Sequence, residues 1–154
     1  MGFESSFTLL REIGTLVLTS QEEVRFSIDA YRGYRYMSVR KYVKSSGISV
    51  PTPSGVTLTP EIVRALVPRI LALPQEASQL PLGPVGKFAK RPGICIVATV
   101  AAVGDLRGLD IRQWEQDKGY TKKGIFLPLA KWAEIRRLFV DTLAAVEAEP
   151  EVNF

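Results

Sequence analysis

The feature that most constrains this chain is an internal repeat, whose two copies lie on either side of a proline-rich connector. Residues 74–84 contain three prolines and a glycine and show no clear hydrophobic period, which is typical of a linker. They separate two stretches, 9–73 and 85–148, that show the same order of patterns. We therefore expect two sheet–helix units joined by a short linker.

The first unit is predicted to contain four strands and then a helix. β-prone residues or two-residue alternation mark strands in 13–20, 24–29, 34–43 and 55–58, while 45–54, with two prolines, is predicted to be a loop. Thr59, Pro60 and Glu61 then form a helix start, with an N-cap hydroxyl, a proline and an acid in the first turn. Apolar residues follow at helical spacing, and Pro68 predicts a kink or an early end.

The second unit repeats this order. Val85-Gly86-Lys87 parallels Ile13-Gly14-Thr15, strands are predicted in 93–103, 108–114 and 124–127, and 115–123 is predicted to be a polar loop. The closing helix carries an apolar face composed of Trp132, Ile135, Phe139, Leu143 and Val146. A unit of about 60 residues is marginally stable alone, and its helix needs a second surface to cover the apolar face.

The repeat therefore predicts an α+β fold of two tandem strand-strand-strand-strand-helix units. Two copies in one chain can cover each other's apolar surfaces, so we expect a pseudo-symmetric pair that shares one core. The sequence leaves open whether this pair associates further.

The composition disfavours several kinds of chemistry. The chain has no histidine and one cysteine, Cys95, so it lacks the commonest general base and metal ligand and cannot form an internal disulfide. Clustered carboxylates that could hold magnesium are confined to Asp105, Asp110, Glu115 and Asp117, whose spacing follows no metal-site pattern. We expect a non-enzyme without metal or cofactor, and keep a metal-dependent nuclease as a weaker alternative.

The hydropathy pattern gives an expectation about location. No apolar run reaches the ~18 residues of a membrane span, and Met1 to Leu10 shows no signal-peptide pattern. We expect a soluble protein that makes no membrane contact and is cytoplasmic, or in the nucleoid or nucleus.

Positive charge and tyrosine concentrate in residues 24–44. Six cations (Arg25, Arg32, Arg35, Arg40, Lys41 and Lys44) stand there against one acid, Asp29, an excess of five that exceeds the net charge of +4 of the whole chain. Alternation places Tyr34, Tyr36, Ser38, Arg40 and Tyr42 on one strand face, with Tyr31 just before them. Rings that stack on unpaired bases and cations that neutralise phosphates are the chemistry of single-strand binding.

The ordered motifs also resemble a known family. Residues 29–33, 38–42 and 55–61 in the first unit, and 109–114, 122–128 and 131–132 in the second, resemble the single-strand-binding domain of the transcriptional coactivator family positive cofactor four. The resemblance implies a unit of four antiparallel strands and a helix, a homodimer built on the helices, and single-stranded DNA on the paired curved sheets. Two units in tandem then imply an intramolecular pseudo-dimer with curved antiparallel sheets and the two helices packed together. It carries binding roles to Tyr31, Arg32 and Arg40 in the first unit, and to Arg112, Lys122, Lys123 and Arg107 in the second.

The sequence departs from the family pattern in both units. The first unit has no lysine pair before Gly55, and the second has a shorter hairpin with Leu106 near the aromatic position. We therefore expect the two units to bind unequally. The Pur and Whirly families, which also bind single strands, are related alternatives.

Together these observations predict a non-catalytic protein that binds single-stranded DNA or RNA in transcription, replication, recombination or repair. The predicted binding residues are Arg25, Tyr31, Arg32, Tyr34, Tyr36, Arg40, Tyr42, Lys44, Lys87, Arg107, Arg112, Trp114, Lys122 and Lys123. Trp114 either stacks on bases or packs at the rim, and the basic patch Lys87, Lys90 and Arg91 either extends the binding track or keeps a strand edge soluble. The alternative is a coactivator-like module whose basic face binds an acidic protein; transcription or recombination proteins are further expected partners.

Overall fold

The computed structural model describes residues 7–148, which form two successive sets of four strands and a helix. Residues 1–6, part of the amino-terminal stretch assessed for a signal peptide, lie outside the described residues. The elements are β1 (Thr8–Val17), β2 (Glu22–Tyr31), β3 (Tyr34–Ser45), β4 (Ile48–Leu58), α1 (Pro60–Leu71), β5 (Gly83–Arg91), β6 (Ile94–Val103), β7 (Leu106–Glu115), β8 (Gly119–Pro128) and α2 (Trp132–Ala148). Short 3₁₀ turns, η2 (Ala77–Gln79) and η3 (Leu129–Lys131), lie in the connector and before α2.

The strands form two separate antiparallel sheets in simple sequential order. The first sheet runs β1-β2-β3-β4 and the second β5-β6-β7-β8, and a helix follows each sheet along the chain. The expected α+β class, with a sheet–helix unit in each half, is therefore confirmed. The edge strands β4 and β8 lie against each other, so the two sheets meet along one side.

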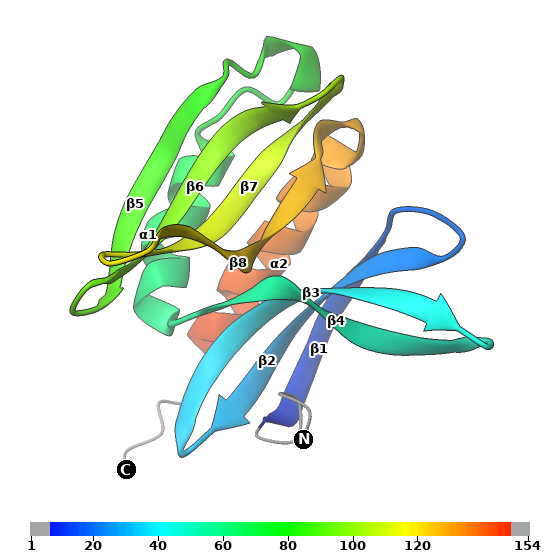
Figure 1. Cartoon of the computed structure of the whole chain (residues 1–154), viewed down its shortest axis with the longest axis vertical. Coiled ribbons are helices and arrows are strands. Elements are labelled where there is room, and N and C mark those ends of the chain that lie inside the picture. The colour runs from blue at the N-terminus through cyan, green and yellow to red at the C-terminus, as the bar shows by residue number, and fades with distance from the viewer. Residues whose placement is uncertain (1–6, 149–154) are drawn as a thin grey trace.

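Each helix packs against the sheet of the other half. The helix α1 contacts β5, while α2 contacts β1 and β2, and the two helices also contact each other. Figure 1 shows both helices behind the green-to-yellow second sheet, with the blue-to-cyan first sheet spreading away beyond α2. Phe26 of β2 and Phe139 of α2 meet edge to face with ring centroids 5.4 Å apart. Gly14 of β1 allows α2 to approach closely, because a Cβ there would come within 2.6 Å of Leu138.

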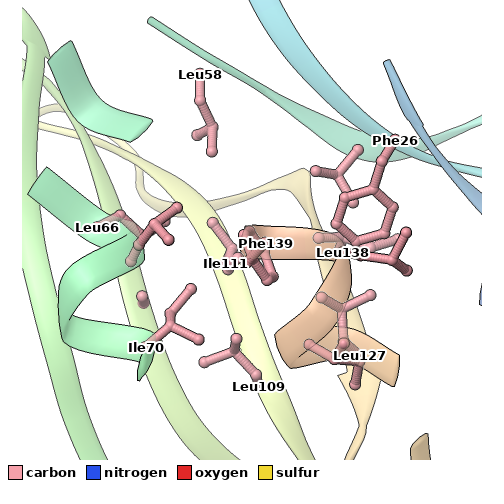
Figure 2. Close-up of a cluster of buried hydrophobic side chains, with 14 of the residues drawn as sticks. Phe26, Leu58, Leu66, Ile70, Leu109, Ile111, Leu127, Leu138 and Phe139 are labelled. Atoms are coloured by element: carbon pink, nitrogen blue, oxygen red, sulfur yellow. The ribbon is translucent and has the colours of Figure 1, made fainter. Parts of the chain in front are cut away.

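One continuous hydrophobic core joins the two halves. Figure 2 shows Leu66 and Ile70 of α1 near Ile111 of β7 and Phe139 of α2. Trp132 is 2% exposed, as expected for a core residue of the helix face. The opposite half covers much of each apolar helix face, and α1 also contacts β3 of its own half.

The end of α1 and the connector are held by side chains of α2. Arg136 donates hydrogen bonds to the carbonyl oxygens of Leu71 and Leu73 at 3.4 and 3.1 Å, which satisfies acceptors that a helix end leaves without a partner. The indole Nε1 of Trp132 donates to the carbonyl of Pro74 at 2.9 Å. The start of α1 has the predicted cap, in which the Thr59 hydroxyl accepts from the amide of Ile62 at 3.2 Å. The helix continues through Pro68 and ends at Leu71.

Two segments predicted to be loops belong to strands. Residues 48–54 form the first part of β4, where Pro51 pairs with Tyr42 and a register shift follows before Gly55 pairs with Arg40. Prolines are tolerated there because β4 is an edge strand and the shift interrupts its ladder. Residues 119–123 likewise extend the edge strand β8, with Tyr120 opposite Trp114. Both expectations were wrong because polar and proline-rich sequence suits an edge strand as well as a loop.

Candidate nucleic-acid interface

The first sheet has one face toward the core and one face, here called the open face, on its other side. On β2, Val24, Phe26 and Ile28 are buried in the core, so Arg25, Ser27 and Asp29 lie on the open face. On β3, Met37 and Val39 point to the core, which leaves the alternate residues on the open face. The register places Arg25 opposite Arg40, Ser27 opposite Ser38 and Asp29 opposite Tyr36.

Arg40 is held across β4 by a local set of contacts. Its Nη1 donates to the carbonyl of Thr52 at 2.9 Å, and the Thr52 hydroxyl donates to the carbonyl of Lys41 at 2.8 Å. Gly55 leaves room for the guanidinium, because a Cβ at this position would lie 2.8 Å from it. These residues form an arginine–threonine–glycine clamp that fixes the guanidinium on the open face.

The second half contains the same clamp, and its arginine also pairs with a carboxylate. Arg112 donates to the carbonyl of Thr121 at 2.9 Å, and a Cβ on Gly124 would lie 2.7 Å from the Arg112 guanidinium. Arg112 also makes two hydrogen bonds, at 2.9 and 3.2 Å, to the carboxylate of Asp110. A large part of the Arg112 charge is therefore compensated within the protein.

Each sheet also carries a ring with a cation over it. The Arg25 guanidinium lies 4.1 Å from the Tyr42 ring centroid, and the Lys87 ammonium lies 4.6 Å from that of Trp114. Arg25 in addition donates to the Glu23 carboxylate at 2.6 Å, and this hydrogen bond raises the pKa of Arg25. Both aromatic residues are partly exposed. A cation over the ring face is a favourable arrangement, and it holds each ring in place.

A second aromatic group lies where β2 and β3 meet. Phe7 stacks on Tyr31 with a centroid separation of 4.8 Å and meets Tyr36 edge to face at 6.4 Å. The Arg32 guanidinium lies 5.1 Å from the Tyr31 ring in the following turn. This ring cluster borders the open face of the first sheet.

The rings and several cations line one open groove of about 520 Å³ between the two halves. This basic groove is lined by Phe7, Tyr31, Tyr36, Arg40, Pro53, Gly55, Val56, Thr57, Lys90, Arg91, Gln113 and Lys123. Three of these described residues are aromatic and four are cationic, and none of them is acidic. The second half supplies three of the four cations, so the groove is completed only by the fused pair.

Lys90 joins the β5–β6 turn to the first sheet. Its ammonium donates to the carbonyl of Thr57 at 2.9 Å and to the hydroxyl of the same residue at 3.0 Å. Burial, followed by the nearby charges of Arg91 and Lys123, lowers the pKa of Lys90 to about 8. A desolvated cation flanked by other cations is a strong attractor for an anion, because the anion relieves the mutual repulsion.

The structure brings only some of the predicted residues together. Tyr31, Tyr36, Arg40 and Lys123 line the basic groove, and Arg25 and Tyr42 lie beside it on the open face. Tyr34, which is 63% exposed, and Arg32 lie at the β2–β3 turn, and Lys44 is exposed toward the β3–β4 turn. Lys87, Arg112 and Trp114 belong to the second sheet, while Lys122 is exposed on β8.

Arg107 lies on the other face of the second sheet. Alternation along β7 places it with Leu109 and Ile111, which point to the core, and its guanidinium donates to the carbonyl of Leu80 in the connector. Arg107 therefore does not share a face with Arg112 and Trp114.

Sequence reasoning did not identify Phe7, Thr57 and Gln113 as lining residues. It noted Lys90 and Arg91 as part of a basic patch that either extends the binding track or keeps a strand edge soluble. The available signal for these two was their place before Pro92 and Gly93, which mark a turn that exposes its flanking side chains. Nothing in the sequence indicates that this turn reaches β4.

The carboxylates considered for a metal site are not gathered. Among residues 7–148, no group of three or more histidine, cysteine or acidic side chains is arranged to hold a metal ion. Asp110 is instead hydrogen-bonded to Arg112. In the same part of the chain, neither helix combines the length and the apolar character that a bilayer crossing requires.

No protein-family model and no curated protein sequence matches the chain. Among solved structures, it is similar to the crystal structure of WHY1 from Arabidopsis thaliana, with a TM-score of 0.39 and 11% sequence identity over 90% of this chain and 94% of that chain.

Proposed function

We propose that this protein binds single-stranded nucleic acid in the basic groove and does so without catalysing a reaction. The observation that carries the proposal is the composition of that groove, where three rings and four cations meet with no acid among the described lining residues. Each stacked base contributes about 1–3 kcal/mol, and each cation that contacts a phosphate releases counterions. An open groove on a sheet suits a flexible strand whose bases are free to turn toward the rings.

The first half supplies most of the aromatic surface, and the second half supplies the cations opposite it. Tyr31 and Tyr36 come from β2 and β3, while Lys90, Arg91 and Lys123 come from β5 and β8. The second sheet's own face is less suited to phosphates, because Asp110 already engages Arg112. We therefore propose one principal binding site per chain, with residues 9–73 and 85–148 as its two repeats.

The family resemblance supports the same function. The motif order that resembles the positive cofactor four family includes Tyr31, Arg40 and Lys123, and these three residues line the basic groove. The resemblance is the reason for proposing single-stranded DNA as the first ligand to test. An acidic protein segment is the competing occupant, since it also would neutralise four cations.

The proposal is tested by fluorescence anisotropy with labelled strands of about 18 nucleotides, longer than the ~4–16 nucleotides that one OB-fold domain covers. Oligothymidylate, oligouridylate and a duplex of the same length are compared in one buffer. We expect the single strands to bind and the duplex to bind at least about tenfold more weakly. Absence of binding to every strand at low ionic strength would contradict the proposal, and equal affinity for duplex would contradict its single-strand preference.

A further inference from the structure

A small polar recess opens beside the basic groove on the first sheet. Its volume is about 60 Å³, and its floor is formed by Ser27, Asp29 and Ser38, with Phe7 and Tyr42 among its walls. One water needs only about 10–15 Å³ of such space, so the recess is large enough for a small polar group. It can therefore receive the polar edge of a nucleobase.

The Asp29 carboxylate is fixed by the two serines. Its Oδ1 accepts from the Ser27 hydroxyl at 2.9 Å, and its Oδ2 accepts from the Ser38 hydroxyl at 2.8 Å. Ser38 is only 6% exposed, so the carboxylate is anchored from the floor of the recess. A carboxylate has about four acceptor positions, and each Asp29 oxygen therefore keeps one for a ligand.

We propose that Asp29 selects guanine in the bound strand. The proposal rests on the function proposed above, since it requires an unpaired base at the open face. The Watson–Crick edge of guanine presents two adjacent donors, N1–H and the N2 amine, which match the two oxygens of one carboxylate. Adenine and cytosine offer one amine beside a ring acceptor, and thymine and uracil offer one N–H between two carbonyl oxygens. Guanine is thus the base that satisfies both oxygens.

The neighbours of Asp29 fit this role. Tyr36 lies opposite Asp29 on β3, and the Arg40 and Arg25 side chains line the same recess. A base whose edge meets Asp29 has a ring beside it, and the nearby guanidinium of Arg40 reduces the repulsion between Asp29 and the phosphates. On the second sheet, the open-face carboxylate of Asp110 does not offer both oxygens to a base in the same way, because Arg112 already donates to both of them.

The test compares thymine strands in which every third base is guanine, hypoxanthine, cytosine or adenine, together with oligothymidylate. Hypoxanthine differs from guanine only by loss of the N2 amine, so the wild-type protein alone probes one of the two contacts. We expect the guanine strand to bind at least about fivefold more tightly than oligothymidylate, and the hypoxanthine strand to lose most of this gain. Asp29→Asn is expected to reduce the guanine preference to below about twofold while it keeps or improves binding of oligothymidylate.

The matched control is Asp105→Asn, which removes one negative charge at the exposed β6–β7 turn. It should leave the guanine preference intact. If wild-type protein binds all five strands with equal affinity, the guanine inference is wrong and the proposed function stands. The inference is also wrong if Asp29→Asn strengthens every strand equally, because Asp29 then acts only through its charge. If wild-type protein binds no strand, the proposed function fails and the inference fails with it.

Discussion

The guanidinium of Arg40 lies over Gly55, and a Cβ atom at residue 55 would come within 2.8 Å of the guanidinium carbon. The Val39 carbonyl lies 2.9 Å from the same position, so a larger residue meets backbone as well as side chain. Arg112 and Gly124 repeat this relationship in the second half at 2.7 Å. The two halves thus share the arginine–threonine–glycine clamp, which lies across the edge strands β4 and β8, along which the sheets meet.

Gly55→Ala and Gly124→Ala are each expected to lower the free energy of unfolding by about 1–3 kcal/mol, because overpacking forces the clamp to shift. Urea denaturation followed by circular dichroism measures the change. Gly55→Ala should lower the free energy of unfolding by less in an Arg40→Ala background, because the contact with the Arg40 side chain is then absent and only the Val39 carbonyl remains close. Unchanged denaturation midpoints for both single variants would show that the clamp accommodates the added methyl group without strain.

Lys90 makes oligonucleotide affinity depend on pH. The pKa of Lys90 in the folded protein is about 8, so the free protein loses this charge as the pH rises past that value. Because a phosphate in the groove favours the charged form, binding above about pH 8 requires Lys90 to take up a proton. We expect the affinity for oligothymidylate to fall several-fold between about pH 7 and about pH 9, a window in which no histidine titrates. Lys90→Arg keeps the charge and should give a flat profile, whereas a slope that persists in Lys90→Arg would assign it to another group.

The same residue affects stability with a definite sign. The pKa of Lys90 falls from 10.5 to about 8 on folding, so the unfolded chain binds more protons between these values. The cost of burying the charge is therefore fully present below about pH 8 and is relieved as the pH rises toward 10.5, by at most about 3 kcal/mol. The difference in unfolding free energy between Lys90→Met and wild type, measured across this window, should shrink by the same amount; a constant difference would contradict the assignment.

The two halves should contribute unequally to binding. Tyr36 lines the basic groove, whereas Trp114 lies on the second sheet, where Asp110 compensates the neighbouring arginine. We expect Tyr36→Ala to weaken oligothymidylate binding by about 1–3 kcal/mol, the contribution of one stacked base, and Trp114→Ala to weaken it by less than half of that loss. Isothermal titration measures both, and equal losses would indicate two equivalent faces.

How much of this arrangement the sequence can predict depends on whether local pattern or long-range contact decides it. The alternation of Tyr36, Ser38 and Arg40 predicts their shared face correctly because β2 and β3 pair without a register shift. The first part of β4 escaped prediction because Pro51 and Pro53 look like loop residues when the interruption of the β4 ladder is unknown. The charge count did not reveal that Asp110 pairs with Arg112, because a count does not show which side chains are hydrogen-bonded.

The groove itself lay beyond local reasoning. Lys90 reaches Thr57 across 33 positions of sequence, and the contact exists only because the sheets meet at β4 and β8. Phe7, which precedes the first strand, gains its importance from stacking on Tyr31. Such contacts follow from tertiary packing of the two halves, which no strand or helix pattern encodes.

The central claim is that the cations of the basic groove contact the phosphates of a single strand. The most direct test is the salt dependence of oligothymidylate affinity between about 50 and about 200 mM salt for wild type, for Arg91→Gln with Lys123→Gln, and for Lys118→Gln with Arg137→Gln. The last pair removes the same charge from exposed positions outside the groove. Each lost phosphate contact reduces the slope of log K against log salt by about 0.7, so the groove pair should reduce it by about 1.4 and the control pair should leave it near the wild-type value. Equal reductions in both pairs would mean that overall charge, and not this groove, holds the strand.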